Sequence, residues 1–361
     1  MESGQKRLLA LDGGGIRGVI TLGVLSRIES TLRDRTGDAS LVLGDWFDYI
    51  GGTSTGAIIA AALARGMSVD EIKSLYRELA TKMFEKPFIV KRFWAKYTSE
   101  PLTAELKRVF GEQTTFGDTS LRCLLMAVLR NASTDSPWPL SNNPNAKFNE
   151  RGPDSNLELP LWQVVRASTA APTFFKPQEI TISGRPHQFV DGGVTSFNNP
   201  AFQLFLMATI DAYRLRWPTG AERMLLVSVG TGFSAKANAN LQQSSMNLGY
   251  NAATVPSALM FAALNQQDML CRVFGDCRVG HELELELGDL RDEPGPVTPK
   301  LFTYLRYNVP LTEPGLTALG LTGIDPATVL KLDSVAHVDS LERIGTALGQ
   351  TIEDAHFAGF A

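Results

Sequence analysis

A serine between closely spaced glycines is the first feature of this sequence that could do chemistry. Residues 52–56 read Gly-Thr-Ser-Thr-Gly, which matches the pattern G-x-S-x-G and lies between an apolar run and a helix-like stretch. Flanking glycines permit a sharp strand-to-helix turn that holds such a serine in a strained backbone conformation. At a helix N-terminus, the positive end of the helix stabilises developing negative charge. The pattern predicts Ser54 as a nucleophile, with Gly52 and Gly56 as supporting residues.

A second glycine-rich stretch, LLALDGGGIRGVI at residues 8–20, contains the literal pattern G-x-G-x-x-G. A dinucleotide-binding fold needs an acidic residue about 20 positions further on, at the end of the second strand. Asp34 and Asp38 come before the next apolar run, and that run ends in another glycine turn. The stretch therefore lacks the context of a dinucleotide site.

With Ser54 as a nucleophile, the first glycine loop acquires another role. Successive amides in a glycine-rich turn at a helix start can surround an oxyanion. We expect Gly13, Gly14 and Gly15 to form this oxyanion hole, with Arg17 orienting the loop or adding positive charge. The alternative, a glycine turn that only packs a helix against a strand, stays open at this point.

The base that would activate the serine is harder to identify. The chain has four histidines: His187, His281, His337 and His356. His281 begins the run HELELEL, which indicates a solvated strand start, and the last two lie in a polar region. His187 and Asp191 share one face of a strand in HQFVDGG, but they would lie about 13 Å apart, which makes a triad from them awkward. Asp191 ends that strand and could project toward Ser54, although an isolated Asp there is otherwise a turn or cap residue.

The elements that must position these residues follow from short apolar runs that alternate with helical patterns. A strand at 8–11 precedes a helix that ends near Gly37, and the same unit is repeated with an apolar run over 41–50 and an Ala-rich helix. Further strands are expected at 121–131, 187–193 and 222–232, with a short one at 138–141. A helix with one apolar face is expected over 340–357. This pattern predicts a three-layer α/β/α fold with a mostly parallel central sheet.

Composition narrows the class of protein. The chain has 361 residues, 44% hydrophobic and 20% charged, which is enough for a substantial core. Its net charge of −4 argues against a nucleic-acid partner. Cys123, Cys271 and Cys277 show no metal-ligand or disulfide-framework spacing, so we expect neither a disulfide scaffold nor a metal site. No cofactor is expected either. We find no signal peptide and no apolar run long enough to cross a bilayer, so a cytoplasmic protein is expected.

The motifs GGGxRG, GTSTG and DGG, in this order, resemble the patatin-like phospholipases. The resemblance continues in ASTAAPTFFKP at 167–177, in Asn-Asn-Pro at 198–200 and in SVGTG at 228–232. It covers roughly residues 6–232. It implies a patatin-like α/β fold, with residues 1–361 as a single domain. That domain would have a catalytic core at about 6–232 and an extension or regulatory part at about 240–361.

The resemblance also implies an activity. It implies a lipid acyl hydrolase of the phospholipase A type that releases fatty acids from membrane phospholipids, with a Ser/Asp dyad and no catalytic histidine. Ser54 would be the nucleophile and Asp191 the base, and Gly192 belongs to the matching DGG motif. The implied partners are a phospholipid or another acyl-ester lipid and a membrane surface, and self-association stays open.

The segment 81–102 mixes aromatic and basic side chains, a composition found at membrane surfaces. The alternative is a cap that packs its aromatic rings over the sheet. Three other functions remain as alternatives for the chain. These are a nucleotide-binding regulator, a catalytically silent lipid-binding scaffold, and a ligand-activated bacterial effector phospholipase, either nucleotide-regulated in antiphage defence or a secreted toxin.

Overall fold

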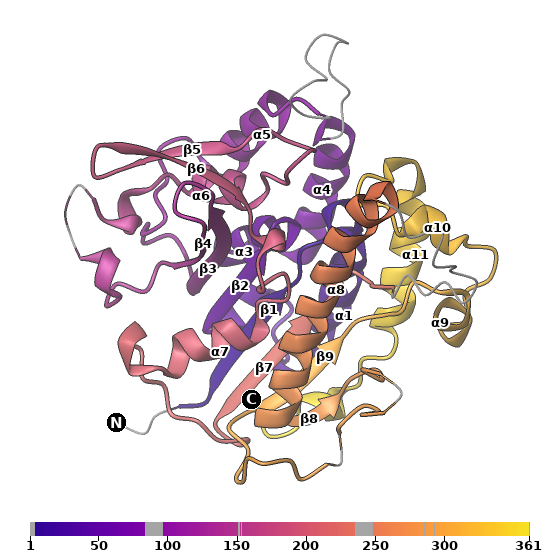
Figure 1. Cartoon of the computed structure of the whole chain (residues 1–361). Coiled ribbons are helices and arrows are strands. Elements are labelled where there is room, and N and C mark those ends of the chain that lie inside the picture. Colours follow the sequence, from indigo (N-terminus) through magenta and orange to yellow (C-terminus); the bar gives the residue numbers. More distant parts are fainter. Residues whose placement is uncertain are drawn as a thin grey trace.

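The described residues form a mixed sheet of nine strands, shown with its helices in the computed structural model of Figure 1. The structure describes residues 4–83, 97–150, 152, 154–234, 248–284, 286–291 and 293–360. The strands are β1 (Lys6–Leu11), β2 (Tyr49–Thr53), β3 (Leu124–Asn131), β4 (Ser136–Ser141), β5 (Gln178–Ile182), β6 (Arg185–Asp191), β7 (Met224–Val229), β8 (Asp276–Val279) and β9 (Thr303–Tyr307). Their order is β5-β6-β3-β2-β1-β7-β9-β8, and β4 also pairs with β3.

The parallel part of the sheet is its centre and one flank. Pairings among β1, β2, β3, β7, β8 and β9 are parallel, whereas those made by β4, β5 and β6 are antiparallel. Strand β1 lies between β2 and β7. The chain runs outward from β1 to β2 and β3 on one side, and later returns to β7 on the other. The strand order therefore reverses at β1, and in open α/β sheets ligands bind at the carboxyl ends of strands beside such a point.

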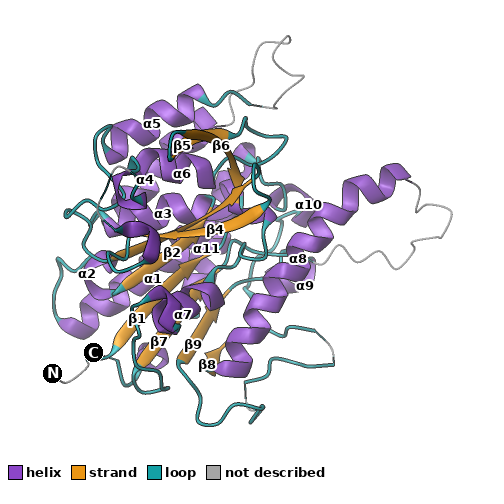
Figure 2. Cartoon of the chain, turned by 60° about the vertical axis from the view of Figure 1, so that its left-hand side comes forward, coloured by secondary structure: helices purple, strands orange, loops and turns teal. Residues whose placement is uncertain are grey.

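Helices cover both faces of the sheet (Figure 2). They are α1 (Gly18–Thr36), α2 (Leu43–Trp46), α3 (Thr55–Ala64), α4 (Val69–Met83), α5 (Glu100–Phe110), α6 (Leu161–Ser168), α7 (Ala201–Thr209), α8 (Leu248–Phe274), α9 (Glu313–Ala318), α10 (Pro326–Val329) and α11 (Val338–Gly349). Leu9 and Leu11 of β1 pack in a core cluster with α1, α3, α4, α5, α6 and α11, and Leu8 and Ala10 pack in a second cluster with α7 and α8. The predicted three-layer α/β/α fold is confirmed.

Two parts of the chain differ from the sequence expectation. The apolar run 41–50 is not one strand, because Leu43 and Trp46 are buried at helical spacing in α2 and the strand β2 starts only at Tyr49. In the C-terminal third, where the only strand indicated is one starting at His281, β8 and β9 at other positions extend the sheet beside β7. The predicted C-terminal helix is found as α11 and a following 3₁₀ turn, Asp354–Phe357.

Candidate active site

Ser54 lies on the sharp turn between β2 and α3. Its backbone dihedrals are φ 55° and ψ −120°, in a region that residues with a side chain rarely adopt. The glycines on either side are required by close backbone approaches. A Cβ on Gly52 would lie 2.1 Å from the carbonyl oxygen of Gly56, and a Cβ on Gly56 would lie 2.2 Å from that of Leu11. The predicted strained strand-to-helix turn is thus present at Ser54, which is half-buried at the N-cap of α3.

Asp191 lies directly beside this serine. The antiparallel pairing of β6 with β3 places Asp191 opposite Leu129, at the carboxyl end of the parallel strands. The Ser54 hydroxyl donates to Oδ2 of Asp191 at 2.5 Å, and the amide of Gly193 donates to Oδ1 at 2.6 Å. Asp191 is 4% exposed. The structure therefore brings together the two residues that the resemblance pairs.

Burial changes the acidity of this carboxyl. It raises the pKa of Asp191 from 3.8 to about 6, although the hydrogen bonds from Ser54 and Gly193 and the nearby Arg166 guanidinium lower it. A carboxylate with a pKa near 6 is still ionised at neutral pH and is a better proton acceptor than an ordinary aspartate. His187 is on the same strand, but its Nδ1 contacts Nδ2 of Asn131 at 3.3 Å.

The glycine loop after β1 packs against the serine turn. A Cβ on Gly13 would lie 3.4 Å from Cβ of Ser54, and a Cβ on Gly14 would lie 2.1 Å from Oγ1 of Thr231. The Gly13 amide donates to the carbonyl of Asn198 at 3.0 Å. The amides of Gly14 and Gly15 make no hydrogen bond to another described residue. Of the three glycines predicted for the oxyanion hole, these two keep a donor available.

Arg17 lies against the glycine loop, a position compatible with both roles considered from sequence. Its Nε donates to the carbonyl of Gly14 at 3.4 Å, so the side chain folds back on the glycine loop. Burial lowers the pKa of Arg17 to about 10, while the carboxylate of Asp12 raises it. The guanidinium therefore stays positively charged at neutral pH beside the loop.

Ser168 supports the serine turn, and sequence reasoning did not single it out. Its hydroxyl oxygen accepts the Ser54 amide at 2.9 Å, and the hydroxyl donates to the carbonyl of Val128 at 2.7 Å. Ser168 lies in the stretch ASTAAP. The family resemblance includes this stretch, but it gives no separate role to Ser168. The Ser54 amide is therefore held by α6.

The C-terminal third also reaches the glycine loop. The amide of Ile16 donates to the carbonyl of Leu332 at 2.9 Å. Asp12, the residue before the loop, forms a buried ion pair with Arg306 of β9 at 2.6 Å. The part of the chain with the weakest resemblance thus helps to hold the site.

The expectation for His281 was wrong. This residue is not the start of a solvated strand, because β8 ends at Val279 and the His281 side chain is 12% exposed. Its Nε2 lies 3.9 Å from Oδ2 of Asp268, and burial lowers the pKa of the ring to about 4. His281 is a neutral, mostly buried side chain at neutral pH.

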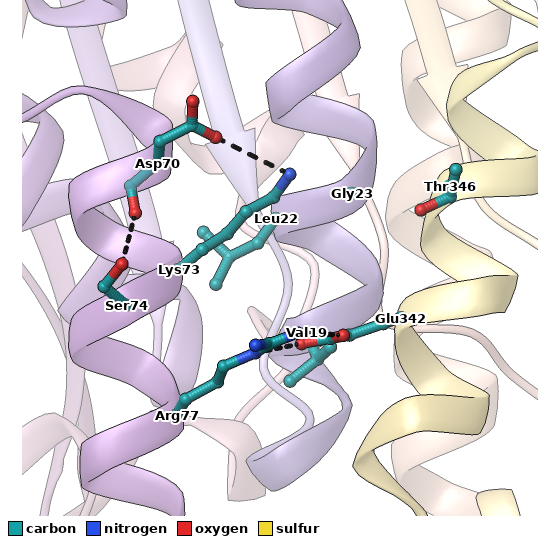
Figure 3. Close-up of a pocket in the computed structure, with 9 residues that line it drawn as sticks. All are labelled: Val19, Leu22, Gly23, Asp70, Lys73, Ser74, Arg77, Glu342 and Thr346. Carbon is teal, nitrogen blue, oxygen red and sulfur yellow. Dashed lines mark hydrogen bonds and ion pairs between the residues drawn. The ribbon is translucent and has the colours of Figure 1, made fainter.

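A concavity of about 370 Å³ lies between α1, α4 and α11 (Figure 3). Neither Ser54 nor Asp191 lines it. Figure 3 shows an ion pair across it, in which Arg77 of α4 contacts Glu342 of α11 at 2.5 Å. Lys73 and Ser74 of α4 also face this opening. It is separate from the serine site.

The segment 81–102, expected from its composition at a membrane surface, is described only at its two ends. Residues 84–96 of the segment 81–102 lie outside the described residues. Tyr97 is buried and donates to Asp333 at 2.6 Å, so this aromatic ring packs in the core. Over the described ranges, no helix has the length and hydropathy needed to span a bilayer. In the same ranges, no group of three or more His, Cys, Asp or Glu side chains is placed to hold a metal ion.

Comparisons with known proteins give a consistent picture. The model of the family described as patatin-like phospholipase matches residues 9–205. A cGAMP-activated phospholipase of Vibrio cholerae is 34% identical over 209 residues, which are 55% of this chain and 56% of that protein. A cGAMP-activated phospholipase of Escherichia coli is 35% identical over 201 residues, 54% of each protein. The 85/88 kDa calcium-independent phospholipase A2 of Mus musculus is 31% identical over 244 residues, 63% of this chain and 27% of that protein. The chain spans about half the length of the two bacterial relatives.

Proposed function

The chain belongs to the patatin-like phospholipase family, and from this premise we propose that it hydrolyses acyl-ester bonds of phospholipids through Ser54 and Asp191. One observation carries the proposal: the Ser54 hydroxyl donates to Oδ2 of Asp191 at 2.5 Å. A serine hydroxyl on a strained turn, bonded to a buried carboxylate, is the arrangement that an activated nucleophile needs.

The proposed reaction uses the residues of the site in two stages. Asp191 accepts the Ser54 proton while the serine oxygen attacks the acyl carbonyl carbon. The tetrahedral oxyanion is stabilised by the amides of Gly14 and Gly15, by the N-terminal end of α3 and by the positive charge of Arg17. The tetrahedral intermediate then collapses as the bond between the acyl carbon and the alcohol oxygen breaks. Asp191 gives its proton to that oxygen, so the lysophospholipid departs as the alcohol and Ser54 remains acylated. A water molecule deprotonated by Asp191 attacks this ester, the bond between the acyl carbon and Oγ of Ser54 breaks, and Asp191 returns the proton to Oγ. This step releases the fatty acid and regenerates Ser54.

Fatty acid release from liposomes tests the proposal. Wild-type protein and a Ser54→Ala variant are incubated with liposomes of one defined phospholipid, and the released fatty acid is measured. Ser40→Ala is a matched control, because Ser40 is an exposed turn serine that donates to Asp38. We expect release by the wild type and the control and none by Ser54→Ala. Binding of the liposomes without release by folded wild type would instead support the silent lipid-binding scaffold.

A regulated form of this activity is the second candidate. The observation that favours it is that two relatives at 34% and 35% identity are named cGAMP-activated phospholipases. We infer that the activity of this chain is also raised by a small ligand of the cyclic dinucleotide class. The liposome assay with and without cGAMP tests this. Faster fatty acid release in the presence of cGAMP supports the regulated enzyme. Release at the same rate with and without cGAMP contradicts it.

A further inference from the structure

Tyr76 of α4 is a buried tyrosine that the proposed reaction does not use. Its side chain is 1% exposed. The hydroxyl donates to the carbonyl oxygen of Gly15 at 2.6 Å and is also hydrogen-bonded to Oγ1 of Thr55. With its one proton on Gly15, the tyrosine oxygen accepts from the Thr55 hydroxyl. One hydroxyl group therefore joins the glycine loop to the serine turn.

At the glycine loop, this contact fixes the peptide that follows the proposed oxyanion donors. The carbonyl of Gly15 accepts from Tyr76, and the amide of Ile16, on the other side of the same peptide, donates to Leu332 at 2.9 Å. Gly15 itself has φ 59°, a left-handed conformation that glycine adopts at little cost. The clamped peptide holds the Gly15 backbone, and with it the direction of its amide.

At the serine turn, the contact reaches the residue directly after the nucleophile. Thr55 is the first residue of α3, and Ser54 is its N-cap. Space for the bridge is provided by Gly18, because a Cβ there would lie 2.4 Å from Oγ1 of Thr55 and 2.8 Å from the tyrosine oxygen. The hydroxyl bridge is thus enclosed between α1, α3 and α4.

We propose that Tyr76 is a positioning residue that sets the distance between the proposed oxyanion donors and Ser54. This inference rests on the proposed function. The tyrosine touches neither the reacting atoms nor the substrate, so it acts through Gly15 and Thr55. Misplacement of a catalytic group by about 1 Å can lower a rate about 100-fold, so loss of the bridge is expected to reduce turnover.

The test is the Tyr76→Phe variant, which removes only the hydroxyl. Tyr49→Phe is the matched control, because Tyr49 is also fully buried and donates to Oγ of Ser141 at 2.6 Å, on the opposite face of the sheet. For Tyr76→Phe we expect kcat on phospholipid liposomes to fall about 10- to 100-fold. We expect KM to change by less than about threefold, because the hydroxyl makes no contact that would bind the substrate in its ground state. Tyr49→Phe is expected to lower the melting temperature to a similar extent but to leave kcat unchanged.

A second variant, Thr55→Val, removes the other side of the bridge and keeps the shape of the side chain. The two substitutions are also combined in one double variant. If the bridge acts as a unit, the second substitution removes nothing more, so kcat of the double variant equals that of Tyr76→Phe alone. If the wild type is active and Tyr76→Phe has the same kcat as the wild type, the positioning role is overturned and the proposed function is not. Equal losses of kcat in Tyr76→Phe and Tyr49→Phe also overturn it. A folded wild type that releases no fatty acid either with or without cGAMP overturns the proposed function and this inference with it.

Discussion

The guanidinium of Arg306 is paired with the carboxylate of Asp12 through two hydrogen bonds of 2.9 and 2.6 Å, and neither side chain is exposed to solvent. Asp12 is the last residue before Gly13, and Arg306 is on β9. The pair therefore ties the start of the glycine loop to a strand from the C-terminal third. Arg306 also donates to Oγ of Ser228 at 2.7 Å. Ser228 is on β7, the strand between β1 and β9, so the same guanidinium contacts all three strands or their ends.

Removal of this arginine is expected to destabilise the fold. Arg306→Met leaves the Asp12 carboxylate buried without its partner, which costs about 3–5 kcal/mol in free energy of unfolding. Urea unfolding followed by circular dichroism measures this loss. The matched control is Arg77→Met, which breaks the ion pair with Glu342, where the arginine is 63% exposed. That change is expected to cost less than about 1 kcal/mol. Similar losses in the two variants would contradict the importance of the buried pair.

Replacement of Gly15 by alanine is expected to abolish activity. Gly15 has φ 59°, and a Cβ there would lie 2.4 Å from the carbonyl oxygen of Leu332, so the loop must move. We expect fatty acid release to fall at least about 100-fold, as on loss of an oxyanion donor. Gly37→Ala is the control, because Gly37 also has a positive φ of 70° but no atom within 4 Å of the added Cβ. The control is expected to lose about 1 kcal/mol of stability and no activity. An active Gly15→Ala variant would show that the loop conformation is not needed.

The pH dependence of the reaction is expected to follow Asp191. A base must be deprotonated, and burial raises the pKa of this carboxyl to about 6. We therefore expect kcat/KM on a soluble p-nitrophenyl ester to rise with pH through a midpoint near 6 and to be constant above about pH 7. A histidine base would give a midpoint nearby, so His187→Gln is measured in parallel. An unchanged profile in that variant agrees with Asp191, and a lost or shifted midpoint points to the histidine.

The same carboxyl makes stability depend on pH. Its pKa is higher in the folded chain, about 6, than its ordinary value of 3.8, so the folded state binds the proton more tightly. The contribution of this group to the free energy of unfolding is fully present below about pH 4 and is lost as pH rises through 6. The loss is about 3 kcal/mol, because each unit of difference between the folded and unfolded pKa is worth about 1.36 kcal/mol. Asp191→Asn removes the ionisation. We expect a higher melting temperature than wild type at pH 8 and little difference at pH 4. A variant that is less stable at pH 8 would contradict burial as the main cause.

Short sequence motifs predicted the residues of the candidate site better than the contacts that hold those residues in place. The sequence placed Ser54 on a strand-to-helix turn, and the turn geometry follows from close approaches at Gly52 and Gly56 that leave no room for a side chain. The hydrogen bond from Gly13 to Asn198 could not be read from the sequence, because the two residues are far apart in the chain. The hydroxyl bridge of Tyr76 was missed for the same reason.

The C-terminal third shows why the rest of the fold could not be predicted. β8 and β9 have four and five residues, which is too short for a clear alternation of apolar and polar side chains. In β9, Arg306 interrupts the apolar pattern, although the residue is buried because Asp12 neutralises its charge. His281 was misjudged in the same way, since its burial depends on packing against Phe233 with ring centroids 4.6 Å apart. Tertiary partners decide burial at these positions.

Covalent labelling of Ser54 tests the central claim most directly. A fluorophosphonate probe phosphonylates an activated serine oxygen with loss of fluoride, and peptide mass spectrometry locates the adduct. We expect one adduct, on Ser54, in the wild type and a strongly reduced labelling rate in Asp191→Asn, in which the base is absent. Labelling of another residue, or equal labelling rates in wild type and Asp191→Asn, would contradict a reaction that depends on the Ser54–Asp191 pair.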